Sequence, residues 1–250
     1  NFQTGTLADD AFNRTIAATS NDSILWLFSD EKLFIGTAES VWTAKPSSNG
    51  AGLSNLDFGA KRQIAFGSAN LPPVYADDTA FYLQRGNQKI RGLSYSLEKD
   101  KNVASDISIK SDHITGTGLT QFAYQMNPIS TIYAIRADGQ CVNCVYESAQ
   151  DVLAWNRMVT KGSYESVASI PSGSTYDEVY FIVNRTINGA SKRYIEVLEP
   201  TLDYSNLRSF FVDSGLTYNG IKQTTLTLST GSGSFVLITQ DGFPLVTQDL

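Results

Sequence analysis

Histidine and cysteine are scarce in this chain of 250 residues, which contains one histidine and two cysteines. Nucleophilic catalysis of the Ser-His-Asp type needs a histidine base. The only candidate, His113, lies in the segment SDHITG, and no serine lies in a G-x-S-x-G elbow. We therefore interpret His113 as a structural or surface residue and predict no catalytic residues.

The two cysteines form the motif CVNC, Cys141 to Cys144, whose spacing occurs in redox and zinc sites. The motif follows an Asp138-Gly139 turn and its surroundings are typical of a strand, in which residues i and i+3 point to opposite faces of the sheet. The sequence has no second CxxC motif. We therefore expect two free thiols, no metal site and no cofactor.

Long apolar runs and an excess of basic residues are also missing. The apolar runs are short, as in ILWLF at 24–28, whereas a membrane helix requires roughly 20 residues. The net charge of −6 argues against a surface that grips phosphates, but it does not exclude a channel along which DNA slides without sticking. The chain starts at Asn1 without methionine or a signal-peptide pattern, which we interpret as an excised fragment or a processed product.

Carboxylate pairs and aromatic residues leave other chemistries open. Asp9-Asp10 and Asp77-Asp78 could do acid and base work as in glycosidases, but both precede strands in turn positions, where Asp bonds nearby backbone N–H groups. The aromatic content of 11% suits sugar binding as well as a β core. A carbohydrate-binding or receptor-binding propeller module and a propeller-type glycosidase are therefore the alternatives to a structural protein.

What the sequence does contain is a repeat. Four segments share the order polar turn, strand, tight turn and strand, and they cover residues 29–44, 77–96, 129–148 and 177–198. Their turn centres fall near Ala38, Gly86, Asp138 and Asn188. The period is therefore roughly fifty residues, which is the spacing of four-stranded propeller blades.

Short segments rich in aromatic or β-branched residues predict further strands at 23–28, 63–67, 121–126, 152–158 and 164–170. Helix signals are weak, and the best candidates are 104–113 and 203–211. We predict an all-β fold of propeller-like antiparallel sheets, with about four blade-like repeats and the start of a small C-terminal β domain. The predicted parts are an extended lead-in over 1–20, the propeller-like domain over 21–205 and the C-terminal β segment over 206–250.

The last repeat, DEVYFIVNRTINGASKRYIEVLEP at 177–200, is the clearest hairpin. Asn188-Gly189 readily takes the positive φ angles of a tight turn, and Val179, Phe181 and Val183 alternate with their neighbours as strand faces do.

Charged side chains surround this turn. We expect Arg185 and Arg193 at outward positions, where they can pair with Glu178 or Glu196 or contact another subunit, since Arg and Tyr are favoured at interfaces. The candidate turn and assembly residues are Gly86, Asp138, Gly139, Arg185, Asn188, Gly189, Arg193 and Tyr194.

An ordered series of segments resembles the tail hub or nozzle proteins (tail tubular or stabilisation proteins) of short-tailed bacteriophages. The series comprises ILWLFSDEKLFIGTAESVW (24–42), KIRGLSYSLEKDKNVASDIS (89–108), AYQMNP (123–128), IRADGQ (135–140), VLAWNRM (152–158), ESVASIP (165–171), the hairpin at 177–200 and FVDSGLTYNG (211–220). The chain departs from the family pattern in its CVNC strand, at Asn156 in a segment that bears histidine in the family, and in its short C-terminal region.

The resemblance implies a virion structural protein rather than an enzyme. It would form a homohexameric ring or tube at the distal part of the phage tail, and it would be made in the cytoplasm of the bacterial host. The implied partners are other copies of the chain, neighbouring tail proteins, and DNA that passes through a lumen without sequence-specific binding.

Overall fold

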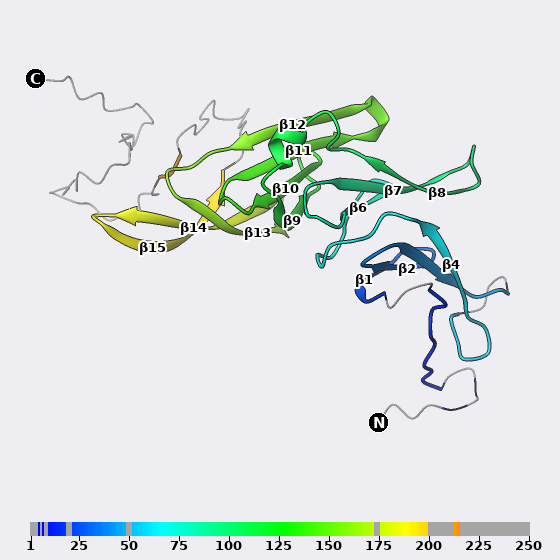
Figure 1. Ribbon diagram of the computed structural model, residues 1–250. Helices are drawn as coiled ribbons and strands as arrows, with labels where there is room; N and C mark the ends of the chain where they lie inside the picture. The colour runs from blue at the N-terminus through cyan, green and yellow to red at the C-terminus, as the bar shows by residue number, and fades with distance from the viewer. Residues whose placement is uncertain are drawn as a thin grey trace, which may run out of the picture.

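The computed structural model describes residues 5, 7, 10–18, 22–48, 52–172, 176–199 and 213–215. Within these residues the chain forms fifteen strands and two short helical turns (Figure 1). Residues 10–18 of the predicted N-terminal lead-in contain no regular strand or helix. The helix predicted over 203–211 and nearly all of the predicted C-terminal segment lie outside the described residues.

The strands form four antiparallel sheets, each of which follows the chain order. The first sheet consists of β1 (Ile24–Ser29), β2 (Leu33–Thr37), β3 (Val41–Lys45) and β4 (Gly59–Ile64). The second consists of β5 (Val74–Ala76), β6 (Thr79–Leu83), β7 (Ile90–Ser96) and β8 (Lys101–Asp106). The third consists of β9 (Leu119–Gln125), β10 (Thr131–Arg136), β11 (Cys141–Glu147) and β12 (Val152–Met158). The fourth consists of β13 (Ser163–Pro171), β14 (Asp177–Ile187) and β15 (Ala190–Leu198). The predicted all-β fold of propeller-like antiparallel sheets is confirmed.

The four turns predicted from the repeat each join the second and third strands of a sheet. Positive φ angles occur in the last three of these turns, at Gly86 (98°), Asn87 (62°), Gly139 (80°), Asn188 (51°) and Gly189 (76°). Glycine and asparagine adopt such angles at low cost, so the local sequence sets these reversals of the chain. The repeat of roughly fifty residues is therefore a repeat of sheets.

Two helical turns lie in the connections, α1 (Asp112–Thr115) before β9 and η1 (Ser148–Gln150) before β12. The helix predicted over 104–113 is wrong for its first part, because β8 continues to Asp106 and pairs with β7. Cross-strand pairing here outweighs the local cap signal. The strand predicted at 63–67 lies earlier, as β4. Neither helical turn in the described chain has the length and apolar character that crossing a membrane requires.

Neighbouring sheets pack face to face in chain order (Figure 1). The core between the first and second sheets contains Trp26, Phe34, Val41, Ile64, Ala80, Tyr82 and Leu93. The core between the second and third contains, among others, Phe81, Leu83, Ile90, Phe122, Ile132 and Val142. The core between the third and fourth contains, among others, Tyr133, Ile135, Tyr164, Val167, Val179, Phe181 and Val183. Each large apolar side chain buried in this way stabilises the fold by roughly 1.5–3 kcal/mol.

The two outermost faces of this series of sheets differ. On the first sheet, Ile35 and Trp42 are covered by Ile16 from the lead-in and by Leu53 and Phe58 from the β3–β4 loop. On the fourth sheet, Ile182, Ile195 and Val197 remain 38%, 79% and 46% exposed. The N-terminal end of the series is therefore covered, whereas no other described segment covers these side chains on the outer face of the last sheet.

A backbone hydrogen bond ties the turn of each of the first three sheets to the segment that enters the next sheet. These turn-to-strand ties, each 2.8 Å long, run from Ser68 N to Thr37 O, from Leu119 N to Asn87 O and from Tyr164 N to Gly139 O. The approach is close at the third tie, where a Cβ on Gly139 would lie 2.8 Å from the Cβ of Ser163. The ties therefore fix the position of one sheet relative to the next.

Candidate functional site

The candidate turn and assembly residues lie at three separate places. Gly86 is in the turn of the second sheet, Asp138 and Gly139 are in the turn of the third, and the others are in the β14–β15 hairpin. Asp138 fixes its turn by accepting hydrogen bonds from Arg136 Nη2 (2.6 Å) and from the backbone N–H of Gln140 (3.2 Å). The turns of the second and third sheets carry turn-to-strand ties, so they serve the fold.

The β14–β15 hairpin projects beyond its own sheet. β13 begins at Ser163, which pairs with Asn184, whereas β14 continues to Ile187, which pairs with Ala190. Nothing lies within 4 Å of the place where a Cβ on Gly189 would stand. In Figure 1 this hairpin lies at one end of the molecule and the first sheet lies at the other. In the part of the chain that the structure describes, the Asn188-Gly189 turn therefore has no segment packed against Gly189.

Arg185 is buried, so the prediction of an outward position for it is wrong. It shares a face of β14 with Val183, and only 7% of it is exposed. Its Nε and Nη2 donate to the two carboxylate oxygens of Glu196 at 2.6 and 2.8 Å. Its Nη1 donates to Asp213 Oδ2 at 3.1 Å and to Lys161 O at 3.2 Å. The Glu196 hydrogen bonds in particular raise the pKa of Arg185, so it stays charged.

The same cluster holds segment 213–215 against the last sheet. Asp213 also accepts hydrogen bonds from the Thr160 hydroxyl at 2.6 Å and from the backbone N–H of Lys161 at 2.9 Å. Burial alone would raise the pKa of Asp213, but the hydrogen bonds from Thr160, Lys161 and Arg185 lower it overall. We call Arg185, Glu196 and Asp213 the arginine clamp. The arginine clamp therefore stabilises the fold and does not form a charged rim at the surface.

Arg193 is exposed, as predicted, but it pairs with Glu165 rather than with either acidic residue named from the sequence. Its Nε lies 2.6 Å from Glu165 Oε2, and 68% of its side chain is exposed. Tyr194 and Ile195 are 40% and 79% exposed, and Lys192 is exposed as well. We call the run from Lys192 to Ile195 the hairpin edge. Lys192 and Tyr194 lie on the face that Arg185 and Val183 occupy, whereas Arg193 and Ile195 lie on the opposite face.

Cys141 and Cys144 lie on opposite faces of β11, as predicted. Cys141 belongs to the core between the third and fourth sheets, and Cys144 belongs to the core between the second and third. Burial raises the pKa of both thiols to about 12, so few thiolates form at neutral pH. His113 is exposed on α1. Among the described residues, no three potential metal ligands lie together.

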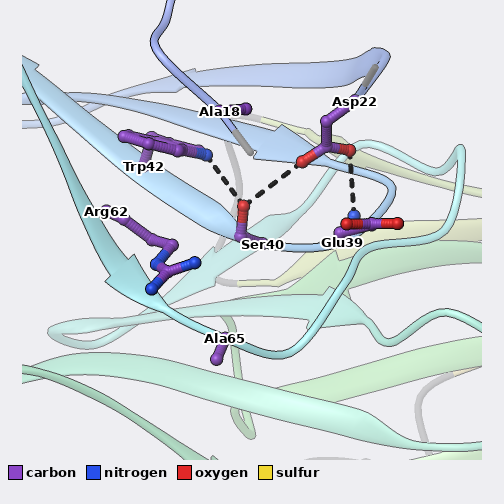
Figure 2. Close-up of a pocket in the computed structure, with 7 residues that line it drawn as sticks. All are labelled: Ala18, Asp22, Glu39, Ser40, Trp42, Arg62 and Ala65. Atoms are coloured by element: carbon purple, nitrogen blue, oxygen red, sulfur yellow. Dashed lines mark hydrogen bonds between the residues drawn. The ribbon is translucent and has the colours of Figure 1, made fainter. Parts of the chain in front are cut away.

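A small polar pocket of about 200 Å³ lies beside the first sheet (Figure 2). It is lined by Ala18, Asp22, Glu39, Ser40, Trp42, Arg62 and Ala65. Trp42 Nε1 donates to Ser40 Oγ at 2.8 Å, and Ser40 Oγ donates to Asp22 Oδ2 at 3.3 Å. Asp22 also accepts the backbone N–H of Glu39 at 3.0 Å. Because these groups bond to one another, the pocket stabilises the β2–β3 turn.

A larger groove of about 1100 Å³ separates parts of the first and second sheets. Phe28 and Phe34 line it from the first sheet, and Tyr75 and Tyr95 line it from the second. The rings of Phe28 and Tyr75 stack with centroids 5.5 Å apart, and Lys32 Nζ lies 5.4 Å from the centroid of Tyr95. Tyr75 and Tyr95 are 39% and 50% exposed. We call this the inter-sheet groove.

Charged side chains of both signs line the inter-sheet groove. The turns β1–β2 and β5–β6 contribute Asp30, Glu31 and Asp78. Burial first, and then these three carboxylates, raise the pKa of Tyr75. The strands β3, β4 and β8 contribute Lys45, Lys61 and Lys101, while Lys32 lies in the β1–β2 turn and Asp100 directly precedes β8. Acidic and basic side chains are therefore interspersed in the groove.

The fold and these surfaces define an all-β protein of propeller-like antiparallel sheets, with a projecting hairpin at one end and an amphipathic groove at the other. No protein-family model matches the sequence, and no curated protein is significantly similar to it. Its function therefore has to be inferred from its own residues and fold.

Proposed function

We propose that this chain is a virion structural protein, a subunit of the tail hub or nozzle of a short-tailed bacteriophage. Several copies would assemble into a ring or tube, with six copies in the form that the family resemblance implies. Neighbouring tail proteins would bind the ring, and DNA would leave the virion through its lumen. The chain would do this without enzymatic activity.

The observation that carries this proposal is the ordered series of resembling segments, because the series follows the order of the sheets. AYQMNP includes the end of β9, IRADGQ forms the β10–β11 turn, and VLAWNRM is β12. ESVASIP lies in β13, and FVDSGLTYNG contains Asp213 of the arginine clamp. Resembling segments that are distant in sequence therefore lie in sheets that pack against one another.

Two further features support a ring subunit. The last sheet presents an open apolar outer face and a projecting hairpin edge, which are surfaces suited to contact with another protein. The net charge of −6 disfavours tight binding of phosphates, so DNA could pass without being held.

The proposal is tested by measuring the mass of the chain in solution with light scattering after size-exclusion chromatography, over a wide concentration range, and by imaging the particles with negative-stain electron microscopy. We expect closed oligomers whose population rises with concentration. Retention of duplex DNA should be weak at physiological salt.

A chain that remains monomeric at every concentration, and that binds an oligosaccharide on a glycan array, would overturn the proposal in favour of a carbohydrate-binding propeller module. Hydrolysis of a glycoside by the monomer would favour a propeller-type glycosidase instead.

A further inference from the structure

The inter-sheet groove continues the core between the first and second sheets. Side chains two residues apart along a strand share a face, so Phe28 shares a face of β1 with the core residue Trp26. In the same way, Tyr95 shares a face of β7 with the core residue Leu93. Phe28 and Tyr95 both line the groove. The two faces that form the core therefore also form the walls of the groove.

Two tyrosine rings are held in place in the groove but are only partly covered. The Tyr75 ring stacks on Phe28 with centroids 5.5 Å apart. The Tyr95 hydroxyl donates to Asp100, and Lys32 Nζ lies 5.4 Å from the centroid of the Tyr95 ring. The two tyrosines nevertheless remain 39% and 50% exposed. Aromatic rings fixed in this way lose little conformational freedom when the apolar face of a ligand packs against them.

A chain of hydrogen-bonded polar side chains lies beside these rings. Gln63 Nε2 donates to Thr43 Oγ1 at 3.0 Å, and Asn102 Nδ2 donates to Gln63 Oε1 at 3.2 Å. Asn102 pairs with Tyr95 across β7 and β8, is only 6% exposed and lines the groove. Its Oδ1 accepts no hydrogen bond from any residue that the structure describes. This oxygen is therefore an oriented acceptor for a hydroxyl group of a ligand.

The charges of the groove lining cancel. Four lysines and four carboxylates line the groove: Lys32, Lys45, Lys61, Lys101, Asp30, Glu31, Asp78 and Asp100. Among the described residues, none of them takes part in a salt bridge. A polyanion such as a nucleic acid would meet repulsion as well as attraction in this groove, whereas a neutral ligand could hydrogen-bond to groups of both signs.

A neutral oligosaccharide combines the properties that the groove requires. The C–H faces of its sugar rings are apolar and pack on aromatic side chains. Its hydroxyl groups donate and accept hydrogen bonds, so they can bond to amides, ammonium groups and carboxylates alike. The volume of about 1100 Å³ slightly exceeds the roughly 300–1,000 Å³ of typical small-molecule sites, which favours a chain of sugar rings over a single ring.

We propose that the inter-sheet groove binds a neutral oligosaccharide, whose sugar rings pack on Tyr75 and Tyr95 and one of whose hydroxyl groups donates to Asn102 Oδ1. This inference goes beyond the proposed function and does not depend on it, because one copy of the chain supplies all the residues of the groove. In a tail subunit, the groove would add contact with carbohydrate at the host surface.

The experiment applies the whole chain to an array of neutral and acidic oligosaccharides and measures the affinity for the best neutral ligand by isothermal titration calorimetry. Tyr95→Ala should weaken binding on the order of tenfold, because it removes a ring surface on which the ligand packs. Tyr95→Phe keeps the ring and loses only the hydrogen bond to Asp100, so its affinity should stay within about threefold of wild type.

A tyrosine outside the groove provides the matched control. Tyr194 is 40% exposed and does not line the groove, so Tyr194→Ala should leave the affinity unchanged. Because the ligand is uncharged, its affinity should change less than about twofold between about 0.05 M and about 0.5 M salt. Circular dichroism and thermal melting of each variant would show that the chains are folded.

The outcomes separate this inference from the proposed function. If no neutral oligosaccharide binds, or if Tyr95→Ala binds as tightly as Tyr194→Ala, the groove proposal is wrong. Binding that is confined to acidic oligosaccharides and lost at high salt would overturn it as well. If no sugar binds and Tyr95→Ala weakens self-assembly, the groove is instead an interface between copies. Sugar binding by a chain that stays monomeric would support the groove proposal and refute the ring.

Discussion

A single guanidinium group, that of Arg185, joins β14, β15, the β12–β13 connection and segment 213–215. Replacement by methionine keeps much of the side-chain volume but leaves Glu196 without its partner in a half-buried position. We expect Arg185→Met to lower the free energy of unfolding by about 3 kcal/mol, as for other broken buried ion pairs. Urea denaturation measures this loss.

The matched control is Arg193→Met, which removes an exposed pair with Glu165 and should cost less than about 1 kcal/mol. Equal losses for the two variants would contradict the structural role of the arginine clamp. Because Arg185 is buried, charge reversal at this position tests folding, whereas charge reversal at the exposed Arg193 tests assembly.

The lowered pKa of Asp213 predicts a pH dependence. The folded protein holds this carboxylate ionised to lower pH than its ordinary value of 3.8, so the unfolded chain binds the proton first as pH falls. The contribution of Asp213 is complete above that value and is lost as pH falls through the lowered pKa.

We therefore expect Asp213→Asn to be less stable than wild type at pH 6, with a difference that shrinks as the pH falls below the ordinary pKa of 3.8. Thermal melting across this range measures the difference. A gap of constant size would show that Asp213 does not change its pKa on folding.

The burial of Arg185 had a signal in the sequence, because it is the next member of the alternation Val179, Phe181 and Val183. Its charge favoured an outward position, and this local argument could not reveal Asp213, which lies far along the chain. The alternation of side chains along the hairpin predicts the outward position of Arg193. Its partner Glu165 lies on β13, so this ion pair depends on the arrangement of strands in the sheet, which the local sequence does not show.

At the scale of the element, the turns of the third and fourth sheets form a matched pair. Gly139 and Gly189 both have positive φ, at 80° and 76°, but a Cβ on Gly139 would meet Ser163 at 2.8 Å, whereas a Cβ on Gly189 would meet nothing. Both substitutions by alanine carry a backbone cost of about 1 kcal/mol.

We expect Gly139→Ala to destabilise by roughly 1–3 kcal/mol more than Gly189→Ala, because it also pushes apart the third and fourth sheets. Chemical denaturation of the two variants gives the difference directly. Similar losses would mean that β13 can shift to accommodate the methyl group.

The sequence predicted the turn positions because their signals are local: Gly, Asn and Asp with alternating strands on both sides. It failed at β8, where residues 104–106 were assigned to a helix but pair with β7. Strand pairing is a tertiary effect, and a short segment with a helix cap does not disclose it.

At the scale of the whole molecule, the two cysteines report on different cores. Cys144 lies between the second and third sheets, and Cys141 lies between the third and fourth. The fourth sheet has an open outer face, so we expect it to separate more readily than the others.

In single-cysteine variants, Cys141 should therefore react with a thiol reagent faster than Cys144 under native conditions, and both should react far more slowly than an unfolded control because burial raises the pKa of each to about 12. Mass spectrometry of labelled protein over time measures both rates. Identical rates would indicate that the molecule opens only by global unfolding.

The inter-sheet groove could not be predicted from the sequence. Its walls come from two different repeats, and its charged side chains come from several separate turns and strands. The sequence predicts that the segments 29–44 and 77–96 form equivalent units. It does not predict how far apart the first and second sheets lie near their turns.

The turn-to-strand ties have a consequence for how the chain folds. Every strand pairs with a sequence neighbour, and each tie spans no more than one repeat, so the strand pairs and the ties form without closing loops longer than one repeat. A low contact order favours rapid folding. The sheets could thus form one after another while the chain leaves the ribosome, each offering a finished surface to the next, as in repeat proteins whose stability spreads from unit to adjacent unit.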